Sequence, residues 1–278
     1  MKIKVWGCRG SLPSPGPENI RYGGNTSCVS VTKDDTLIIL DGGSGIQRLG
    51  KVVAPEVKEL HVLLTHLHID HTMGLGFFQP LYNPKIQVHF WGPSTTIEPL
   101  LHRLRRYFSP PLFPVRMNEL PNHPIIHEVG NSEFSIGELQ IKSTYICHPG
   151  PTLGYRITDG NSVFAYMPDH EPALGYPHFP NDLEWTSGVE IAENADLLFH
   201  DGQYTDEEYK SKIGWGHSSI NDAIAFGGEC KVMKMAIFHH DPLNSDDRLE
   251  EIYKEAITQT KPTYTVIICK EGEEFELG

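Results

Sequence analysis

Short apolar runs, separated by clusters of glycine, proline and aspartate, recur along the whole chain. Runs of this length that are rich in β-branched and aromatic residues and are bounded by turn formers are typical of β-strands. The pattern therefore predicts strands in both halves of the chain. The predicted strands comprise residues 3–6, 27–32, 36–40, 60–64, 86–91, 134–136, 140–146, 154–158, 162–167, 197–199, 235–238 and 264–269.

Four segments between these strands predict helices. They comprise residues 97–107, 187–194, 220–226 and 248–258. The proline-rich stretch 109–114 must be irregular, because proline removes backbone donors and blocks helix, and it is a candidate wall of an active site. Strands in both halves with helices outside them indicate a layered α/β architecture of two covered sheets. No repeat or linker-like composition shift divides residues 1–278, which we expect to form a single domain.

The composition resembles that of an ordinary globular enzyme. Hydrophobic residues make up 39% and charged residues 21% of the chain. The first residues lack the apolar core of a signal peptide, and no stretch approaches the roughly 18 apolar residues that cross a bilayer. The five cysteines are an odd number without a CxxC pair, which suits a reducing compartment. We therefore expect a cytoplasmic protein without a membrane partner.

The formal net charge is −13. A protein whose surface follows DNA or RNA neutralises many phosphates with lysine and arginine, so this charge argues against DNA and disfavours RNA as a partner. A small anionic substrate is compatible, because two divalent ions would concentrate positive charge at one place. One basic stretch, Arg103, Arg105 and Arg106 with Arg116 beyond it, indicates either a solvated helix face or a contact to substrate phosphate.

The richest concentration of candidate chemistry is the heptad Thr-His-Leu-His-Ile-Asp-His at residues 65–71. His66 and His68 alternate in an extended segment and so point the same way. Asp70 and His71 follow where the chain must leave the strand, so they can face a second ion. Imidazoles with a carboxylate suit zinc, manganese or iron. The heptad predicts two divalent metal ions, with zinc favoured, and the alternative is a histidine-rich surface loop.

The later predicted strands also end in potential ligands. Loops at strand ends converge on one edge of a sheet, so we expect these residues to meet there. They are His148, Asp169, His200, Asp201, His239, His240 and Asp241. Adjacent residues that leave a strand point in opposite directions, so only one of His239 and His240 is expected to bind metal.

This order of residues, HxHxDH followed by a lone histidine, an aspartate and a final histidine, resembles the metallo-β-lactamase superfamily. The resemblance extends from about Val5 to Asp241 and implies a four-layer αββα sandwich. It also favours His239 over His240 as the metal ligand. Carried over residue by residue, it implies two metal sites and one bridging ligand: His66, His68 and His148; Asp70, His71 and His239; and Asp169 between them.

Three further segments resemble the phosphodiesterase branch of this superfamily, which includes transfer-RNA 3′-end nucleases. They are residues 7–14, residues 41–47 and the pair 200–204 and 216–219. The resemblance implies that Asp41 orients a ligand imidazole. It also implies that Asp201 and His217 handle the proton at the leaving oxygen. Asp201 stands where the branch has a glutamate, so its reach to His217 is an open question.

We therefore predict a binuclear metal-dependent hydrolase of a small phosphodiester, with a cyclic nucleotide as the leading candidate. Hydrolysis would proceed by attack of a metal-bridging hydroxide, with Asp70, Asp201 and His217 as the catalytic residues. A transfer-RNA 3′-end endonuclease is one alternative, and a carboxylic ester, lactone or thioester hydrolase is another. A non-catalytic metal-binding sensor is the third. Homodimers are common in this branch, so a second copy of the chain is a candidate partner.

Overall fold

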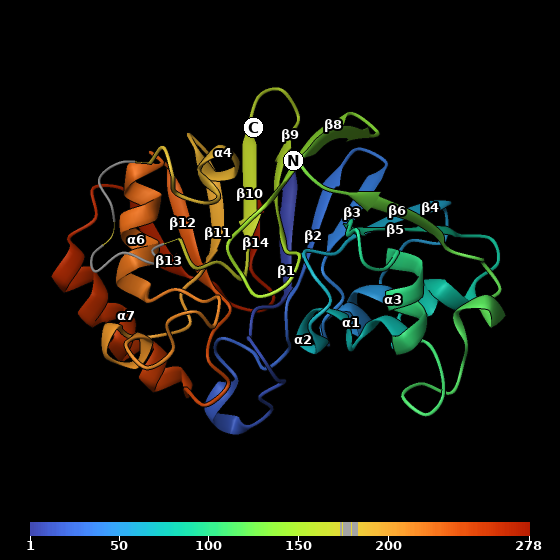
Figure 1. Ribbon diagram of the computed structural model, residues 1–278, viewed down its shortest axis with the longest axis horizontal. Helices are drawn as coiled ribbons and strands as arrows, with labels where there is room; N and C mark the ends of the chain where they lie inside the picture. Colours follow the sequence, from blue (N-terminus) through green and yellow to red (C-terminus); the bar gives the residue numbers. More distant parts are fainter. Residues whose placement is uncertain (173, 175–178, 180–182) are drawn as a thin grey trace.

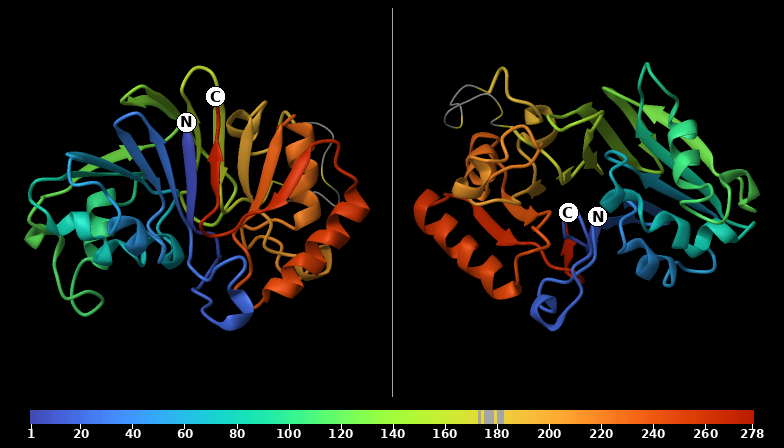
Figure 2. Two further views of the ribbon diagram at one scale, coloured as in Figure 1. Left: turned by 180° about the vertical axis from the view of Figure 1, so that it is seen from behind. Right: turned by 60° about the horizontal axis from the view of Figure 1, so that its bottom comes forward.

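Two mixed seven-stranded sheets form the centre of the computed structural model, which describes residues 1–278 except 173, 175–178 and 180–182. The strand orders are β14-β1-β2-β3-β4-β5-β6 and β13-β12-β11-β10-β9-β8-β7. Figure 1 shows the two sheets facing each other, with helices on their outer sides. The first and last strands, β1 and β14, pair with each other, and Figure 2 shows both chain ends beside them.

All twelve predicted strands are present, with ends that differ by at most two residues. The first sheet contains β1 (Lys2–Gly7), β2 (Cys28–Lys33), β3 (Thr36–Leu40), β4 (Glu59–Leu63), β5 (Gln87–Pro93), β6 (Ile125–Val129) and β14 (Glu274–Glu276). The second contains β7 (Ser132–Ile136), β8 (Leu139–Tyr145), β9 (Leu153–Thr158), β10 (Val163–Met167), β11 (Leu197–Asp201), β12 (Lys234–Phe238) and β13 (Thr265–Ile268). The apolar pattern missed β6 and β14, because each is an edge strand with few buried positions.

The helices depart further from the prediction. They are α1 (Ile46–Gly50), α2 (Ile69–Thr72), α3 (Leu100–Tyr107), α4 (Val189–Ala192), α5 (Asp206–Tyr209), α6 (Ile220–Glu229) and α7 (Asp246–Thr260). Helix α3 begins later than predicted because Pro99 is its N-cap with an extended ψ of 145°. Helix α4 is shorter because Gly188 precedes it at a φ of +80°. Helices α1, α2 and α5 are too short to produce a detectable helical period.

Apolar side chains pack in three layers around the sheets. Alternate residues of both sheets fill the space between them, including the buried Val5, Leu40, Tyr155, Phe199 and Phe238. A second cluster lies between the first sheet and helices α1 and α3, and a third lies between the second sheet and helices α6 and α7. The predicted four-layer αββα sandwich is therefore confirmed. None of the described helices is long and apolar enough to cross a membrane.

Parallel pairing brings the candidate chemistry to one edge of each sheet. Strands β3 to β6 are parallel to one another, as are β10 to β13. Carboxyl ends of parallel strands lie on the same edge, where ligands bind in open α/β sheets. The heptad follows β4, Asp169 follows β10, and His239 follows β12.

Candidate metal centre

The heptad lies at a junction between a strand and a helix. His66 and His68 follow β4 in extended backbone, and His68 is the N-cap of the one-turn helix α2, with a ψ of 155°. Asp70 and His71 lie within α2 and are buried, whereas His68 is exposed. Because the chain turns into α2 at His68, the pair His66 and His68 and the pair Asp70 and His71 occupy neighbouring positions.

Two groups of side chains at this edge contain the predicted ligands, could hold a metal ion each and share Asp169, and a third group, Asp201, His217 and His239, lies beside them. One potential ligand atom from each residue lies within 4.8 Å of the others in its group. The two groups are His66, His68, His148 and Asp169, and Asp70, His71, Asp169 and His239. These clusters fit a binuclear metal site and bring together all seven residues that the sequence singles out. Their individual roles as ligands stay a prediction.

Buried atoms without partners support the fit to metal ions. Among the described residues, His66 Nε2, His71 Nε2 and Asp169 Oδ1 are buried and have no hydrogen-bond partner. Such an atom costs roughly 1–3 kcal/mol when it is left unsatisfied. Imidazole nitrogens and carboxylate oxygens are ligands of zinc and of the other transition metals. A cation at each group would satisfy these atoms.

Asp41 and Thr65 orient two of the imidazoles. His71 donates from Nδ1 to Asp41 Oδ2 at 2.8 Å, which is the contact predicted for Asp41. The Thr65 hydroxyl donates to Asp41 at 3.0 Å, so its oxygen accepts from His66 Nδ1 at 3.0 Å. Because both Nδ1 atoms carry the ring proton, the Nε2 lone pairs of His66 and His71 face the centre.

Two more imidazoles are held in the same way. His148 donates from Nδ1 to the carbonyl of Gly216 at 2.7 Å. His239 donates from Nδ1 to Gln203 Oε1 at 3.2 Å. Both contacts leave Nε2 as the unprotonated ring nitrogen, which is the tautomer that a metal ligand needs.

The structure separates His239 from His240. His239 Nε2 lies 3.1 Å from Asp70 Oδ2 and 3.3 Å from Asp169 Oδ1, inside the second group. His240 donates from Nε2 to the carbonyl of Cys269 at 2.7 Å and is directed away from the centre. Their geometry favours His239 as the last ligand.

We expect replacement of Asp41 by asparagine to weaken metal affinity by about 10- to 100-fold. Asp41 accepts hydrogen bonds from the Thr65 amide, the Thr65 hydroxyl, His71 and Tyr166, and one amide oxygen cannot serve all of these donors. Asparagine tolerates the φ of +60° at this position, so the backbone should be retained. Competition dialysis with a chelator measures the affinity, with the exposed Asp35→Asn as control. Equal affinities would contradict this role.

The histidines of the centre lower the pKa values of its two carboxylates. Burial acts to raise the pKa of Asp169, but His239, His71 and His66 hold that pKa well below its usual range. Burial likewise acts to raise the pKa of Asp70, but His71 and His239 lower it. Both carboxylates are therefore ionised at neutral pH and available to cations.

The opening loop contacts this centre directly. The amide of Ser11 donates to Asp70 Oδ2 at 2.7 Å. Arg9, which is fully buried, donates to the carbonyls of Asn244 at 2.7 Å and Asp241 at 3.2 Å. The loop therefore connects Asp70 to the segment that follows His239.

His217 and Asp201 form a hydrogen-bonded pair beside the second group. His217 Nδ1 lies 2.6 Å from Asp201 Oδ2, so the shorter aspartate does reach the histidine. Asp201 is fully buried and also accepts from the amide of Gln203 at 3.0 Å. Burial acts to lower the pKa of His217, but Asp201 raises it to about 9. The His217 ring stacks on His239 with centroids 4.9 Å apart.

Glu171 is an organising residue that the sequence did not reveal. Its buried carboxylate accepts from the amides of Gly214 and Gly216 at 2.7 Å each and from the Tyr209 hydroxyl at 2.8 Å. Gly216 in turn holds His148 through its carbonyl. The available signals were the proximity of Glu171 to Asp169 in sequence and the glycines before His217, and neither specifies a contact.

A cavity of about 320 Å³ opens beside the first group. His66, His68, Thr95, Ile97, Arg103 and Pro149 are among the residues that line it. Its volume lies within the range for small-molecule sites, about 300–1,000 Å³. The proline-rich stretch lines a different cavity: Leu112, Phe113 and Pro114 lie there with Ile69 of the heptad and Tyr107, so its role as a wall of the active site stays a prediction.

The remaining candidates take other positions. The basic stretch divides, because Arg103 lines the 320 Å³ cavity whereas Arg106 pairs with Glu98 at 2.9 Å. His200 is fully buried, lies outside both metal groups and contacts His170 Nδ1 through its Nε2 at 2.9 Å.

Two facing sheets carry histidine and aspartate clusters at their strand ends, an arrangement that suits a metal-dependent hydrolase. Residues 38–240 match the family model described as "Beta-lactamase superfamily domain", and the chain belongs to this superfamily. Among curated proteins, a "Ribonuclease Z" of Thermococcus onnurineus is 23% identical over 256 residues, which cover 77% of this chain and 79% of that protein.

Solved structures share the fold across nearly the whole chain. The metallo-beta-lactamase fold protein YhfI from Bacillus subtilis has a TM-score of 0.74 at 20% identity, with 99% of this chain and 98% of that chain covered. A diphosphatase from the PhnP family has a TM-score of 0.67 at 17% identity, with 99% and 96% covered. At these identities the likeness shows the fold alone.

Proposed function

We propose that the protein is a phosphodiesterase that cleaves a small phosphodiester such as a cyclic nucleotide. The observation that carries the proposal is the His217–Asp201 pair, 2.6 Å apart and adjacent to the second metal group. Phosphodiester cleavage expels an alkoxide that needs a proton, and a protonated histidine can supply it. Hydrolysis of an ester or a lactone also expels an alkoxide, so a comparison of substrates must separate these classes from phosphodiesters.

The residues divide the chemistry between them. Two divalent ions at the seven predicted ligands, with zinc favoured, would lower the pKa of water and stabilise charge on the phosphoryl oxygens. Asp70 and Asp169 can accept or orient the proton of the attacking water. Asp201 fixes His217 through Nδ1, which leaves Nε2–H to protonate the leaving oxygen. Such proton transfer typically contributes about 10²- to 10⁴-fold.

Three observations favour a small substrate. The cavity beside His66 and His68 has a volume of about 320 Å³ and includes one arginine, Arg103. The net charge of −13 opposes an extended polyanion. One of the proteins with this fold is a diphosphatase. The second candidate, a transfer-RNA 3′-end endonuclease, is favoured by relatives named ribonuclease Z.

A substrate panel on metal-loaded protein tests the proposal. It should contain 3′,5′- and 2′,3′-cyclic nucleotides, a precursor transfer RNA, a lactone and bis-nitrophenyl phosphate. We expect kcat/KM for a cyclic nucleotide to exceed that for the RNA and the lactone by at least about 100-fold, or about 2.7 kcal/mol of transition-state free energy. A higher kcat/KM for the RNA or for the lactone than for the cyclic nucleotides would contradict the proposal and would favour the endonuclease or the lactone hydrolase, respectively. Absence of turnover with zinc, manganese and iron would favour a sensor.

A further inference from the structure

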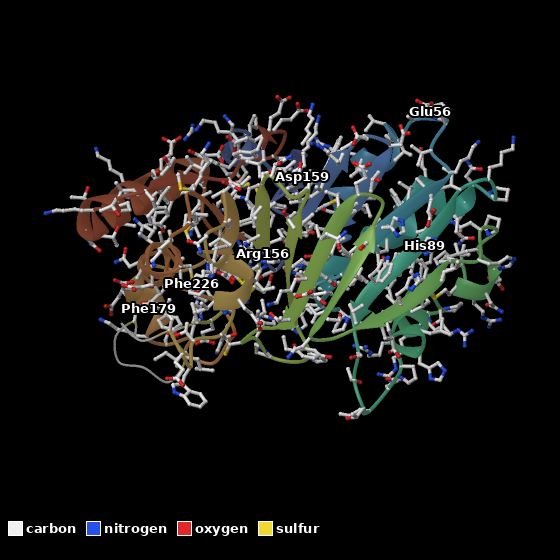
Figure 3. The ribbon with its side chains drawn as sticks, turned by 90° about the horizontal axis from the view of Figure 1, so that it is seen from above. Glu56, His89, Arg156, Asp159, Phe179 and Phe226 are labelled. Carbon is white, nitrogen blue, oxygen red and sulfur yellow. The ribbon has the colours of Figure 1, made fainter. Side chains whose placement is uncertain are left out.

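A second cluster of histidines lies on the first sheet, outside the groups at the metal centre. Glu59 and His61 belong to β4, and His89 is the neighbour of His61 in the parallel pairing of β4 with β5. Glu59 is the first residue of β4 and His61 is its middle residue, whereas the heptad follows the end of the strand. Figure 3 shows His89 in the same part of the molecule as Glu56 and remote from Phe226.

Three side chains of this cluster converge on one point. Glu59 Oε1 lies 3.0 Å from His89 Nε2 and 3.4 Å from His61 Nε2. The potential ligand atoms of the three residues all lie within 4.8 Å of one another. Each imidazole is 13% exposed and the Glu59 side chain is 56% exposed, so solvent reaches the point of convergence.

The surroundings prepare His89 to bind a cation. Its Nδ1 lies 2.8 Å from His127 Nε2, which can accept a hydrogen bond from Nδ1–H when a cation replaces the proton at His89 Nε2, beside Glu59. His127 is held in place because it stacks on Trp91, with centroids 3.8 Å apart. Burial, together with His89 and His127, lowers the pKa of His61 to about 4.

We propose that Glu59, His61 and His89 form an additional metal site that binds one divalent ion of the zinc class. Two imidazoles and one carboxylate are a donor set that zinc and neighbouring transition metals use, whereas calcium and magnesium prefer oxygen ligands alone. The exposure of Glu59 allows water to complete the coordination. The site is separate from the catalytic centre and does not depend on the proposed phosphodiesterase function.

Binding carries a specific structural cost at Trp91. The Trp91 indole donates from Nε1 to His61 Nδ1 at 3.2 Å, so in the metal-free form His61 carries its proton on Nε2, facing Glu59. An ion at Nε2 requires this proton to move to Nδ1, which breaks the hydrogen bond from Trp91. The loss amounts to one neutral hydrogen bond, and it makes the fluorescence of Trp91 a reporter of occupancy.

Metal stoichiometry tests the site. Protein loaded with zinc by equilibrium dialysis should contain one more ion per chain than His89→Ala, and Glu59→Gln should bind that ion at least about tenfold more weakly. His102→Ala, which removes an exposed histidine of α3, should keep the wild-type stoichiometry. Glu59 is exposed, so Glu59→Gln remains informative if His89→Ala does not fold. Equal zinc content in wild type, His89→Ala and Glu59→Gln would overturn the proposal.

Fluorescence provides an independent measurement on protein whose catalytic centre is already filled. Further zinc should change the tryptophan emission of the wild type, and His61→Ala and Trp91→Phe should abolish the change. Trp91→Phe should still bind the additional ion, because it removes the reporter and no ligand. An unchanged response in His61→Ala would refute the assignment. Neither experiment uses turnover, so failure of this site and failure of the proposed function can be told apart.

Discussion

Replacement of Asp169 by asparagine should lower kcat/KM by at least about 10³-fold, because several kcal/mol of charge stabilisation by metal ions would be lost. Among the residues that the structure describes, Asp169 is the one that belongs to both metal groups. It is buried beside His66, His71 and His239, which hold the pKa of its carboxyl well below the usual range and keep it ionised. Elemental analysis should find fewer than two ions per chain in the variant, and steady-state kinetics should show the loss of turnover.

The exposed Asp35→Asn is the matched control and should keep both the metal content and the activity. Circular dichroism would establish that the Asp169 variant is folded. A folded Asp169→Asn protein that retains two ions and full turnover would exclude the bridging role. Restoration of activity by excess metal alone would instead locate the defect in affinity.

Replacement of His217 by alanine should spare the metal content but lower turnover of diesters with alkoxide leaving groups by about 10²- to 10⁴-fold. Nitrophenyl phosphodiesters need little protonation of the leaving oxygen and should lose much less. The physical reason is the position of His217, whose Nδ1 is engaged by Asp201 and whose ring stacks on His239. The measurement is the ratio of kcat/KM for the two kinds of diester.

Asp201→Asn provides a graded variant for the same role. An asparagine could still contact His217 Nδ1 but would no longer support its positive charge, so the loss should be intermediate and should again depend on the leaving group. Equal losses on both kinds of diester in His217→Ala would remove the general-acid assignment. Loss of metal in that variant would place His217 among the ligands instead.

One loop supports both the predicted metal binding by His148 and the predicted proton donation by His217. Glu171 holds Gly214 and Gly216, and Gly216 fixes the tautomer of His148. His217 follows at once in the chain, so the same buried carboxylate positions a predicted metal ligand and the predicted acid. This shared support explains how residues 214–217, which form no helix or strand, can position both His148 and His217.

Most strands could be predicted from the sequence because they are buried on one or both faces, and their apolar runs end at turn formers. Strands β6 and β14 were not, since an edge strand has a neighbour on one side only and tolerates polar residues. The one-turn helix α2 was also missed, although it carries Asp70 and His71. Its four residues are stabilised by tertiary contacts and carry no periodic pattern of their own.

The sequence by itself determined the two covered sheets and the metal chemistry of the heptad, because metal chemistry restricts which residue types can serve and their spacing is local in the heptad. Its resemblance to a known superfamily supplied the four-layer fold and the full set of seven candidate ligands. Only the tertiary structure decided how His239 differs from His240, that Asp201 reaches His217, and that Glu171 holds the loop between them. These contacts join residues far apart in the chain, and their geometry depends on strand pairing and packing. Hydrogen-bond direction, which sets the tautomer of each imidazole, therefore becomes visible only when the partners are brought together.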